Sequence, residues 1–278
     1  MTDAPKAFVT GWPISHSRSP LIHGTWLREL GLAGSYEKIA VPPDAFARFL
    51  GGLRADGFVG GNVTIPHKEA AFAACARRDA AAEAIGAVNT LWFEGDALTG
   101  SNTDAYGFSA NLDERLSGWR EAETAVVLGA GGAARAVVHA LKAAGVADVT
   151  ILNRTRERAE RLADAFGAEA GGEGEFEALA PRFDLVVNTR PADPDGLAPA
   201  DVRAIEALPE GALVTDIVYV PLETPLLAAA AARGLRTADG LGMLLHQAVP
   251  GFERWFGRRP AVGEALRAAV IRDIAGGS

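Results

Sequence analysis

The stretch from residue 124 to residue 158 constrains the fold more than any other part of this sequence. An apolar run at 125–128 leads into the turn Gly129-Ala130-Gly131-Gly132. An alanine-rich helical pattern follows over 133–144, and a second apolar run covers 149–152. A strand, a glycine-rich turn, a helix and a second strand in this order are typical of a dinucleotide-binding domain.

The small residues of this stretch have separate roles. Gly129 permits the tight turn, Gly131 lets the backbone approach a pyrophosphate, and Ala134 lets the helix pack against the strand. The start of the helix then offers N–H groups and positive partial charge to phosphates. The alternative is a glycine-rich turn in another doubly wound sheet, but the flanking strands and helix favour a dinucleotide.

The residues after the second strand predict which dinucleotide binds. An NAD site usually has Asp or Glu at this point, which accepts hydrogen bonds from the ribose hydroxyl. Here the sequence reads Asn153-Arg154-Thr155-Arg156-Glu157-Arg158. Guanidinium groups bind a 2′-phosphate, and cations are unfavourable at a helix start unless an anion is nearby. The pattern therefore favours NADP over a merely solvated basic helix start.

Composition limits the class of protein. The 278 residues are 49% hydrophobic and carry a net charge of −8, which argues against general nucleic-acid binding. The single cysteine, Cys75, excludes a disulfide within the chain. The first residues lack an apolar signal core, and no run is long enough for a bilayer. We expect a cytoplasmic protein.

Strand and helix patterns alternate before the dinucleotide stretch. We expect an α/β fold, with an N-terminal α/β substrate domain, a Rossmann-like doubly wound NADP-binding domain and a cleft between them. The last two helical patterns have no strand left to pair with, so the first of them should return to the first domain. The expected domains are 1–107 with 241–278 for substrate and catalysis, and 108–240 for NADP.

Polar residues follow several strands of the expected first domain. Ser17 and Ser19 follow the first strand, while Thr64 and Lys68 follow the third. Ligands of open α/β sheets bind beyond the carboxyl ends of strands, so this set suits a small polyhydroxylated acid. A lysine near a helix start should have a lowered pKa, which suits proton transfer. Taken singly, Ser19 also fits a helix cap before Pro20, and Lys68 fits a solvated cation of a helix opened by Pro66.

Nine motifs together show a family resemblance. They cover residues 13–20, 61–69, 86–90, 102–107, 129–135, 153–155, 216–219, 224–227 and 240–248. In these motifs the chain resembles the shikimate dehydrogenases over essentially its whole length. The resemblance implies hydride transfer between NADPH and the ring ketone of 3-dehydroshikimate, giving shikimate and NADP⁺. This is a step of chorismate and aromatic amino acid biosynthesis.

The resemblance also implies roles for single residues. Lys68 would be the catalytic acid and base, paired with Asp104, although Asp104 alone also fits a helix cap. Ser17 and Ser19 would hold the ring carboxylate with help from Tyr219. The implied substrate residues are Ser17, Ser19, Thr64, Lys68, Asn89, Asp104, Tyr219 and Gln247. The implied cofactor residues are Gly129, Gly131, Gly132, Ala133, Asn153, Arg154, Thr155, Arg158, Gly240 and Met243.

One loop departs from the family pattern. After Val187-Asn188-Thr189 the family usually continues with small hydroxyl residues and then Gly-Met. This chain continues with Arg190-Pro191-Ala192-Asp193-Pro194. The change affects the expected cofactor contacts of this loop rather than the chemistry, and the sequence gives no reason for Arg190.

Other functions fit the sequence less well. A quinate/shikimate dehydrogenase of broader specificity often prefers NAD and would keep the acidic residue that is absent here. A non-catalytic NADP-binding relative would not need Lys68 and Asp104, and a folate-type dehydrogenase does not explain Ser17 and Ser19. The five histidines show no metal-ligand spacing. The expected partner is the small-molecule substrate, with no metal, nucleic acid or membrane, and the sequence leaves open whether the protein is a monomer or a homodimer.

Overall fold

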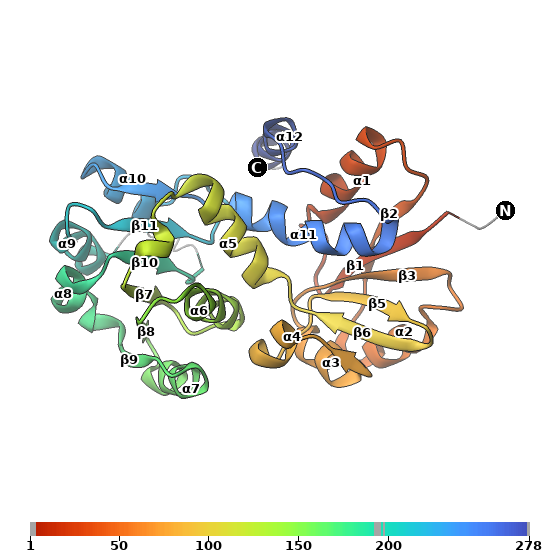
Figure 1. Ribbon diagram of the computed structural model, residues 1–278, viewed down its shortest axis with the longest axis horizontal. Coiled ribbons are helices and arrows are strands. Elements are labelled where there is room, and N and C mark those ends of the chain that lie inside the picture. Colours follow the sequence, from red (N-terminus) through yellow and green to blue (C-terminus); the bar gives the residue numbers. More distant parts are fainter. Residues whose placement is uncertain (1–3, 192–195, 197, 277–278) are drawn as a thin grey trace. The chain divides into compact units, whose positions relative to one another are not determined.

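The computed structural model describes residues 4–191, 196 and 198–276. The chain divides into two compact units, of which unit 1 contains Met1–Thr103 and Leu245–Ser278 and unit 2 contains Asp104–Leu244. Each unit has its own six-stranded sheet (Figure 1). Within the described part of the chain, no helix has the length and apolar character needed to cross a membrane.

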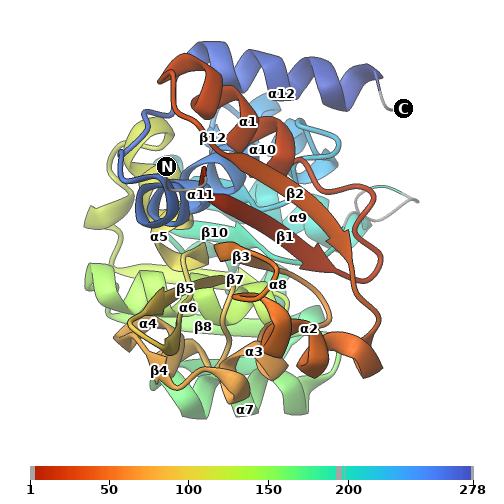
Figure 2. The ribbon, with the colours of Figure 1, turned by 90° about the vertical axis from the view of Figure 1, so that its right-hand side faces the viewer.

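The sheet of unit 1 is mixed, with the strand order β2-β1-β3-β5-β6-β4. Its parallel part consists of β1 (Lys6–Gly11), β2 (Ser35–Ala40) and β3 (Phe58–Val63), and Figure 2 shows β1 and β2 side by side. The hairpin of β5 (Thr90–Glu94) and β6 (Ala97–Ser101) is antiparallel to β3, and the short β4 (Arg77–Arg78) pairs with β6. The helices are α1 (Ser19–Glu29), α2 (Phe46–Gly52) after a 3₁₀ turn at Pro43–Ala45, α3 (Lys68–Ala74), α4 (Ala80–Ile85), most of α11 (Leu241–Phe256) and α12 (Glu264–Gly276).

Alternation along β1 gives this sheet two buried faces. Ala7 packs with Trp92 and with Trp255 of α11, whereas Phe8 faces the opposite core that contains Phe46. Successive side chains of a strand point to opposite faces, so one strand supports both cores. The Nε1 group of Trp255 also donates to the backbone oxygen of Leu91 at 2.8 Å. Helix α11 therefore packs against the sheet of unit 1.

His23 of α1 is a fully buried histidine in an aromatic cluster. Its ring stacks on Tyr36 with 3.9 Å between ring centroids and meets Trp26 edge-on. Burial lowers the pKa of His23 to about 3, against a smaller opposing effect of Asn62. The imidazole is therefore neutral in the folded protein at neutral pH.

This burial should make the free energy of unfolding depend on pH. The unfolded chain binds a proton on His23 below pH 6.5, but the folded chain does so only near pH 3, so stability is lost as pH falls through this window. Between pH 6.5 and 5 the wild-type protein should lose about 2 kcal/mol more than a His23→Phe variant. Urea unfolding of both proteins at the two pH values measures the difference. Equal losses would show that His23 is not neutral in the fold.

The sheet of unit 2 is entirely parallel, with the order β12-β11-β10-β7-β8-β9. Its strands are β7 (Thr124–Leu128), β8 (Asp148–Asn153), β9 (Glu169–Gly172), β10 (Leu185–Asn188), β11 (Leu213–Asp216) and β12 (Arg236–Ala238). From β7 the chain adds β8 and β9 on one side of the sheet and then β10, β11 and β12 on the other side. Ligands of such sheets bind where the direction changes, so a ligand is expected beyond the carboxyl ends of β7 and its neighbours. This is the doubly wound fold that the sequence predicts.

Helices and apolar side chains cover this parallel sheet. The helices are α5 (Asp104–Arg115), α6 (Gly132–Ala144), α7 (Arg156–Phe166), α8 (Phe176–Leu179), α9 (Pro199–Ala207) and α10 (Pro225–Ala232), with 3₁₀ turns at Trp119–Glu121, Glu173–Glu175 and Ala180–Arg182. Val126 and Val127 on β7 are both fully buried although they point to opposite faces. Continuous apolar strands of this kind are typical of sheets covered on both sides.

Two helix starts differ from the sequence expectation. Ser19 is the first residue of α1 rather than its cap, and the capping position is Arg18, which makes no side-chain cap. The hydroxyl of Ser17 accepts the backbone N–H of Ser19 at 3.4 Å, which ties the loop to the first residue of the helix. The helix expected to open at Pro66 begins two residues later, at Lys68.

Candidate functional site

The loops that follow β1 and β3 are bonded to each other. The backbone N–H of Thr64 donates to the oxygen of Thr10 at 2.9 Å, and that of Trp12 donates to the oxygen of Ile65 at 3.0 Å. Because β1 and β3 are parallel neighbours, their carboxyl ends meet at one edge of the sheet. The structure thus places Thr64 beside the loop that carries Ser17 and Ser19.

Ser19 is held by the residues around the start of α1. It is 7% exposed, and its hydroxyl forms a hydrogen bond with Tyr36. Burial raises the pKa of the Tyr36 phenol well above its ordinary value, and the hydrogen bond with Ser19 offsets only part of this effect. Tyr36 therefore stays neutral, and Ser19 is hydrogen-bonded to a protonated phenol rather than to a charged group.

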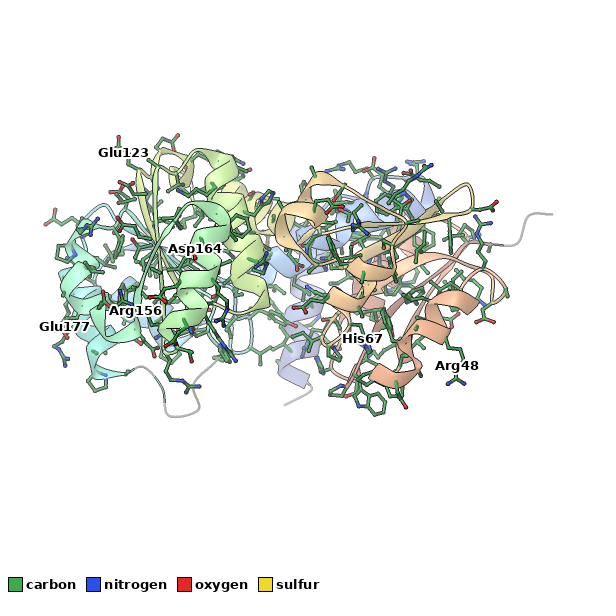
Figure 3. The ribbon with its side chains drawn as sticks, turned by 90° about the horizontal axis from the view of Figure 1, so that it is seen from below. Arg48, His67, Glu123, Arg156, Asp164 and Glu177 are labelled. Carbon is green, nitrogen blue, oxygen red and sulfur yellow. The ribbon has the colours of Figure 1, made fainter. Side chains whose placement is uncertain are left out.

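Lys68 is joined to the polar segment before β5. It is the first residue of α3 and partly buried, and its backbone oxygen accepts the N–H of Val88 at 3.0 Å. The preceding His67 is buried, with its Nε2 atom 2.7 Å from the backbone oxygen of Val41 and its ring stacked on Phe46 (Figure 3). His67 is therefore a packing and hydrogen-bonding residue, and Lys68 is the candidate base.

Asn89 connects the ends of β3 and β6. Its backbone oxygen accepts from Val63 at 2.8 Å, and its N–H donates to Ser101 at 3.0 Å. The side-chain oxygen of Asn89 accepts the backbone N–H of Thr103 at 2.9 Å, and the hydroxyl of Thr103 donates to the backbone oxygen of Gln247 at 2.8 Å. These bonds bring Asn89 and Gln247 of α11 together, and Asp104 follows Thr103 as the first residue of α5.

The glycine-rich turn of unit 2 has the space that a phosphate needs. Gly129 has φ +107°, which favours glycine, and a Cβ there would collide with the hydroxyl of Thr189. A Cβ at Gly131 or Gly132 would meet no atom within 4 Å. Helix α6 begins at Gly132 without a side-chain cap. The N–H groups of its first turn have no partner within the helix, and a helix of 13 residues has positive partial charge at this end, so the start of α6 favours an anion.

Asn153 joins this turn to the basic segment after β8. Its Oδ1 atom accepts the N–H of Ala130 at 3.1 Å, and its Nδ2 atom donates to the oxygen of Thr155 at 2.8 Å. Arg154 and Arg158 are exposed and form no ion pair with a described residue. These residues fit an NADP molecule with its pyrophosphate at the turn and its 2′-phosphate at the arginines.

Arg156, which Figure 3 labels, has carboxylate partners that Arg154 and Arg158 lack among the described residues. Its guanidinium forms ion pairs with Glu160 at 3.1 Å and with Glu175 at 3.0 Å. The sequence shows three arginines in this segment, but the structure gives one of them two carboxylate partners. This division supports Arg154 and Arg158 as the phosphate-binding pair.

Gly240 fixes the segment around the end of β11. A Cβ on Gly240 would overlap the backbone of Ile217, and the N–H of Gly240 donates to the oxygen of Val218 at 3.3 Å. Tyr219 follows in the same loop, and Met243 is a buried residue in the first turn of α11. Only glycine fits at 240, so this loop and the start of α11 stay in close contact.

Sequence reasoning missed two buried polar groups of this protein. One joins Arg190 to carboxylates of unit 2, and the other joins Tyr36 to Asn62 in unit 1. Arg190 stands where the sequence departs from the family, whereas Ala192, Asp193 and Pro194 of that loop lie outside the described residues. Within the described ranges, no group of three or more His, Cys, Asp or Glu residues could hold a metal ion.

Models of three family domains match the sequence in order. Residues 9–91 match the shikimate dehydrogenase substrate binding domain, residues 112–218 match shikimate / quinate 5-dehydrogenase, and residues 240–270 match the shikimate 5′-dehydrogenase C-terminal domain. Together these ranges include the glycine-rich turn of unit 2 and six of the candidate substrate residues, namely Ser17, Ser19, Thr64, Lys68, Asn89 and Gln247, whereas Asp104 and Tyr219 lie outside them.

Individual proteins are similar over almost the whole chain. Shikimate dehydrogenase (NADP(+)) of Mesorhizobium japonicum is 60% identical, over 97% of this chain and 96% of that protein. The protein of the same name from Brucella melitensis biotype 2 is 58% identical, over 99% of this chain and 96% of that protein. The crystal structure of shikimate 5-dehydrogenase from Thermus thermophilus in complex with NADP(H) and shikimate matches with a TM-score of 0.84 and 38% identity. This match covers 97% of this chain and 99% of that chain.

Proposed function

The chain belongs to the shikimate dehydrogenase family, and we propose that it catalyses the reversible, NADP-dependent interconversion of shikimate and 3-dehydroshikimate. The observation that carries the proposal is 58% identity, over 99% of this chain, to a protein named shikimate dehydrogenase (NADP(+)). The reaction belongs to chorismate and aromatic amino acid biosynthesis. The cytoplasmic location stays a prediction from the sequence, and the choice between monomer and homodimer stays open.

The proposed substrate residues are Ser17, Ser19, Thr64, Asn89 and Gln247 of unit 1 and Asp104 and Tyr219 of unit 2. Ser17 and Ser19 would hold the ring carboxylate with Tyr219, because hydroxyl donors suit an anion that needs no full counter-charge. Thr64, Asn89, Asp104 and Gln247 would bind the ring hydroxyls. The bonds from Asn89 through Thr103 to Gln247 support this arrangement, because they hold two of these residues in one place.

Lys68 and Asp104 are the proposed catalytic pair. When bound, NADP accepts or gives the hydride at its nicotinamide ring. Lys68 as the neutral amine would take the proton from the reacting hydroxyl of shikimate, and as the ammonium ion it would return the proton to the ketone oxygen in the reverse direction, while Asp104 orients the side chain of Lys68.

The cofactor is proposed to bind along one end of the sheet of unit 2. The N–H groups at residues 129–133 would hold the pyrophosphate, while Asn153, Thr155, Arg154 and Arg158 would hold the adenosine 2′-phosphate. Gly240 and Met243 would lie near the nicotinamide. Two observations support this placement. A Cβ at Gly131 would meet no atom within 4 Å, and Arg154 forms no ion pair with any residue that the structure describes.

One assay tests the proposed function. Purified protein is mixed with shikimate and NADP⁺, and the absorbance of reduced nicotinamide is followed, with parallel reactions that contain NAD⁺ or quinate. We expect fast reduction only with shikimate and NADP⁺. Comparable rates with quinate or NAD⁺ would instead assign the protein to the relatives of broader specificity. Absence of reduction in every reaction, with NADP still bound, would favour a non-catalytic relative.

A further inference from the structure

A series of buried hydrogen bonds crosses the sheet of unit 1 and ends at a proposed substrate residue. The phenol oxygen of Tyr36 on β2 lies 2.5 Å from Oδ1 of Asn62 on β3. The Nδ2 atom of Asn62 lies 3.1 Å from the hydroxyl of Thr90 on β5, which lies 2.8 Å from Oδ1 of Asn89. Asn62, Asn89 and Thr90 are all less than 7% exposed, so water does not compete with these bonds.

Thr103 determines which way the amide of Asn89 is turned. A backbone N–H group can only donate, and that of Thr103 lies 2.9 Å from Oδ1 of Asn89. This atom of Asn89 is therefore the amide oxygen. The nitrogen of the same amide points to the other side of the side chain.

Asn62 determines the direction of the remaining bonds. The backbone oxygen of Asn89 can only accept, and it lies 3.1 Å from Nδ2 of Asn62. The second N–H of this nitrogen donates to the hydroxyl of Thr90. The hydroxyl of Thr90 consequently donates to Oδ1 of Asn89, and Tyr36 donates to the amide oxygen of Asn62.

We propose that Asn62 is a positioning residue for substrate binding. It holds the backbone oxygen of Asn89 directly and the side-chain oxygen of Asn89 through Thr90, so the amide of Asn89 is turned with its nitrogen, which carries N–H donors, toward the substrate. A hydroxyl oxygen of shikimate accepts such donors, whereas the turned amide would offer it an oxygen instead. Pre-orienting the amide before binding also removes the cost of ordering it in the complex. This inference rests on the proposed function, in which Asn89 contacts the substrate.

Two variants remove the positioning bonds by different routes. Asn62→Asp keeps the size of the side chain but removes both N–H donors. Thr90→Val keeps the shape of the side chain and removes only the hydroxyl between Asn62 and Asn89. Each variant should raise the KM for shikimate about 5- to 10-fold, with little change in kcat or in the KM for NADP⁺.

A matched control and a double-mutant cycle separate positioning from a general loss of stability. Thr99→Val changes another buried threonine of the same hairpin, whose hydroxyl bonds only weakly to Ala97 at 3.5 Å, and it should leave both KM values unchanged. In an Asn89→Ala background, Thr90→Val should no longer raise the KM for shikimate.

Several results would overturn the proposal. One is an unchanged KM for shikimate in both Asn62→Asp and Thr90→Val. Another is an equal rise of the KM for shikimate and the KM for NADP⁺. The third is that Thr90→Val raises the KM for shikimate as much in the Asn89→Ala background as in the wild type. Thr90→Val alone is sufficient for the test should Asn62→Asp fail to fold. Failure of the proposed function is seen separately, because the wild-type protein would then not oxidise shikimate with NADP⁺ at all.

Discussion

Lys68→Ala should lower the turnover of shikimate by roughly 10²–10⁴-fold while leaving the KM for shikimate nearly unchanged. In the proposed mechanism Lys68 moves the proton of the reacting hydroxyl, and removing a positioned acid or base slows only the chemical step. Its backbone oxygen bonds to Val88 in any case, so the alanine variant keeps the local fold. Steady-state kinetics in the direction of shikimate oxidation measure both constants.

The matched control for this prediction is Lys6→Ala in the same unit. Lys6 lies at the start of β1, where its ammonium group bonds to the backbone oxygen of Asp56 at 3.1 Å and covers the ring of Phe58. This lysine has no proposed part in catalysis, so its removal should leave turnover unchanged. A large rise in KM with normal turnover in Lys68→Ala would make Lys68 a substrate-binding cation and not the proton carrier.

Strongly patterned segments of the fold were predictable from the sequence. The apolar run before Gly129 forms β7, and the alanine-rich segment forms α6. The weak segments were not predictable. β9 reads Glu-Ala-Gly-Gly, which lacks the branched and aromatic residues that favour strands, and it is a strand because β8 offers it a free edge. β4 has only two residues and exists through its pairing with β6.

The candidate site was predictable where its residues belong to one short sequence motif. It was not predictable where residues distant in the sequence are brought together by the pairing of strands. Thr64 and Lys68 belong to one motif, so their chemistry is visible in the sequence. Tyr36 and Asn62 are 26 residues apart and meet only because β2 and β3 both pair with β1. A buried asparagine in a strand gives no sign of its partners until the strand order is known.

Arg190 shows the same limit in unit 2, because its two acidic partners lie 17 residues before it and 11 residues after it. Its guanidinium lies 2.5 Å from a carboxylate oxygen of Glu173 and 2.9 Å from one of Asp201, and it also donates to Asn188 at 2.9 Å. Burial lowers the pKa of Arg190, but Asp201 and Glu173 together raise it above its ordinary value. Asn188 in turn donates to Asp216 at 3.0 Å. The arginine therefore joins the ends of β10 and β11 to α9.

Arg190→Met should lower the free energy of unfolding by about 3–5 kcal/mol, because the variant leaves a buried carboxylate without its partner. Asp201 is only 6% exposed, so water cannot replace the lost guanidinium. Urea or thermal unfolding measures the loss. Arg203→Ala breaks the exposed ion pair of Arg203 with Glu177 in the same unit and should have no measurable effect on the unfolding midpoint.

A second variant tests whether the buried charge causes this loss. Adding Asp201→Asn to Arg190→Met removes the unpaired carboxylate and should recover a large part of the stability, since a neutral pair costs less to bury than one isolated charge. If the double variant is as unstable as Arg190→Met alone, the arginine stabilises the unit through its bond to Asn188 and through packing. If Arg190→Met is as stable as the wild type but binds NADP more weakly, the ion pairs are dispensable, and the guanidinium contacts the cofactor as the family position suggests.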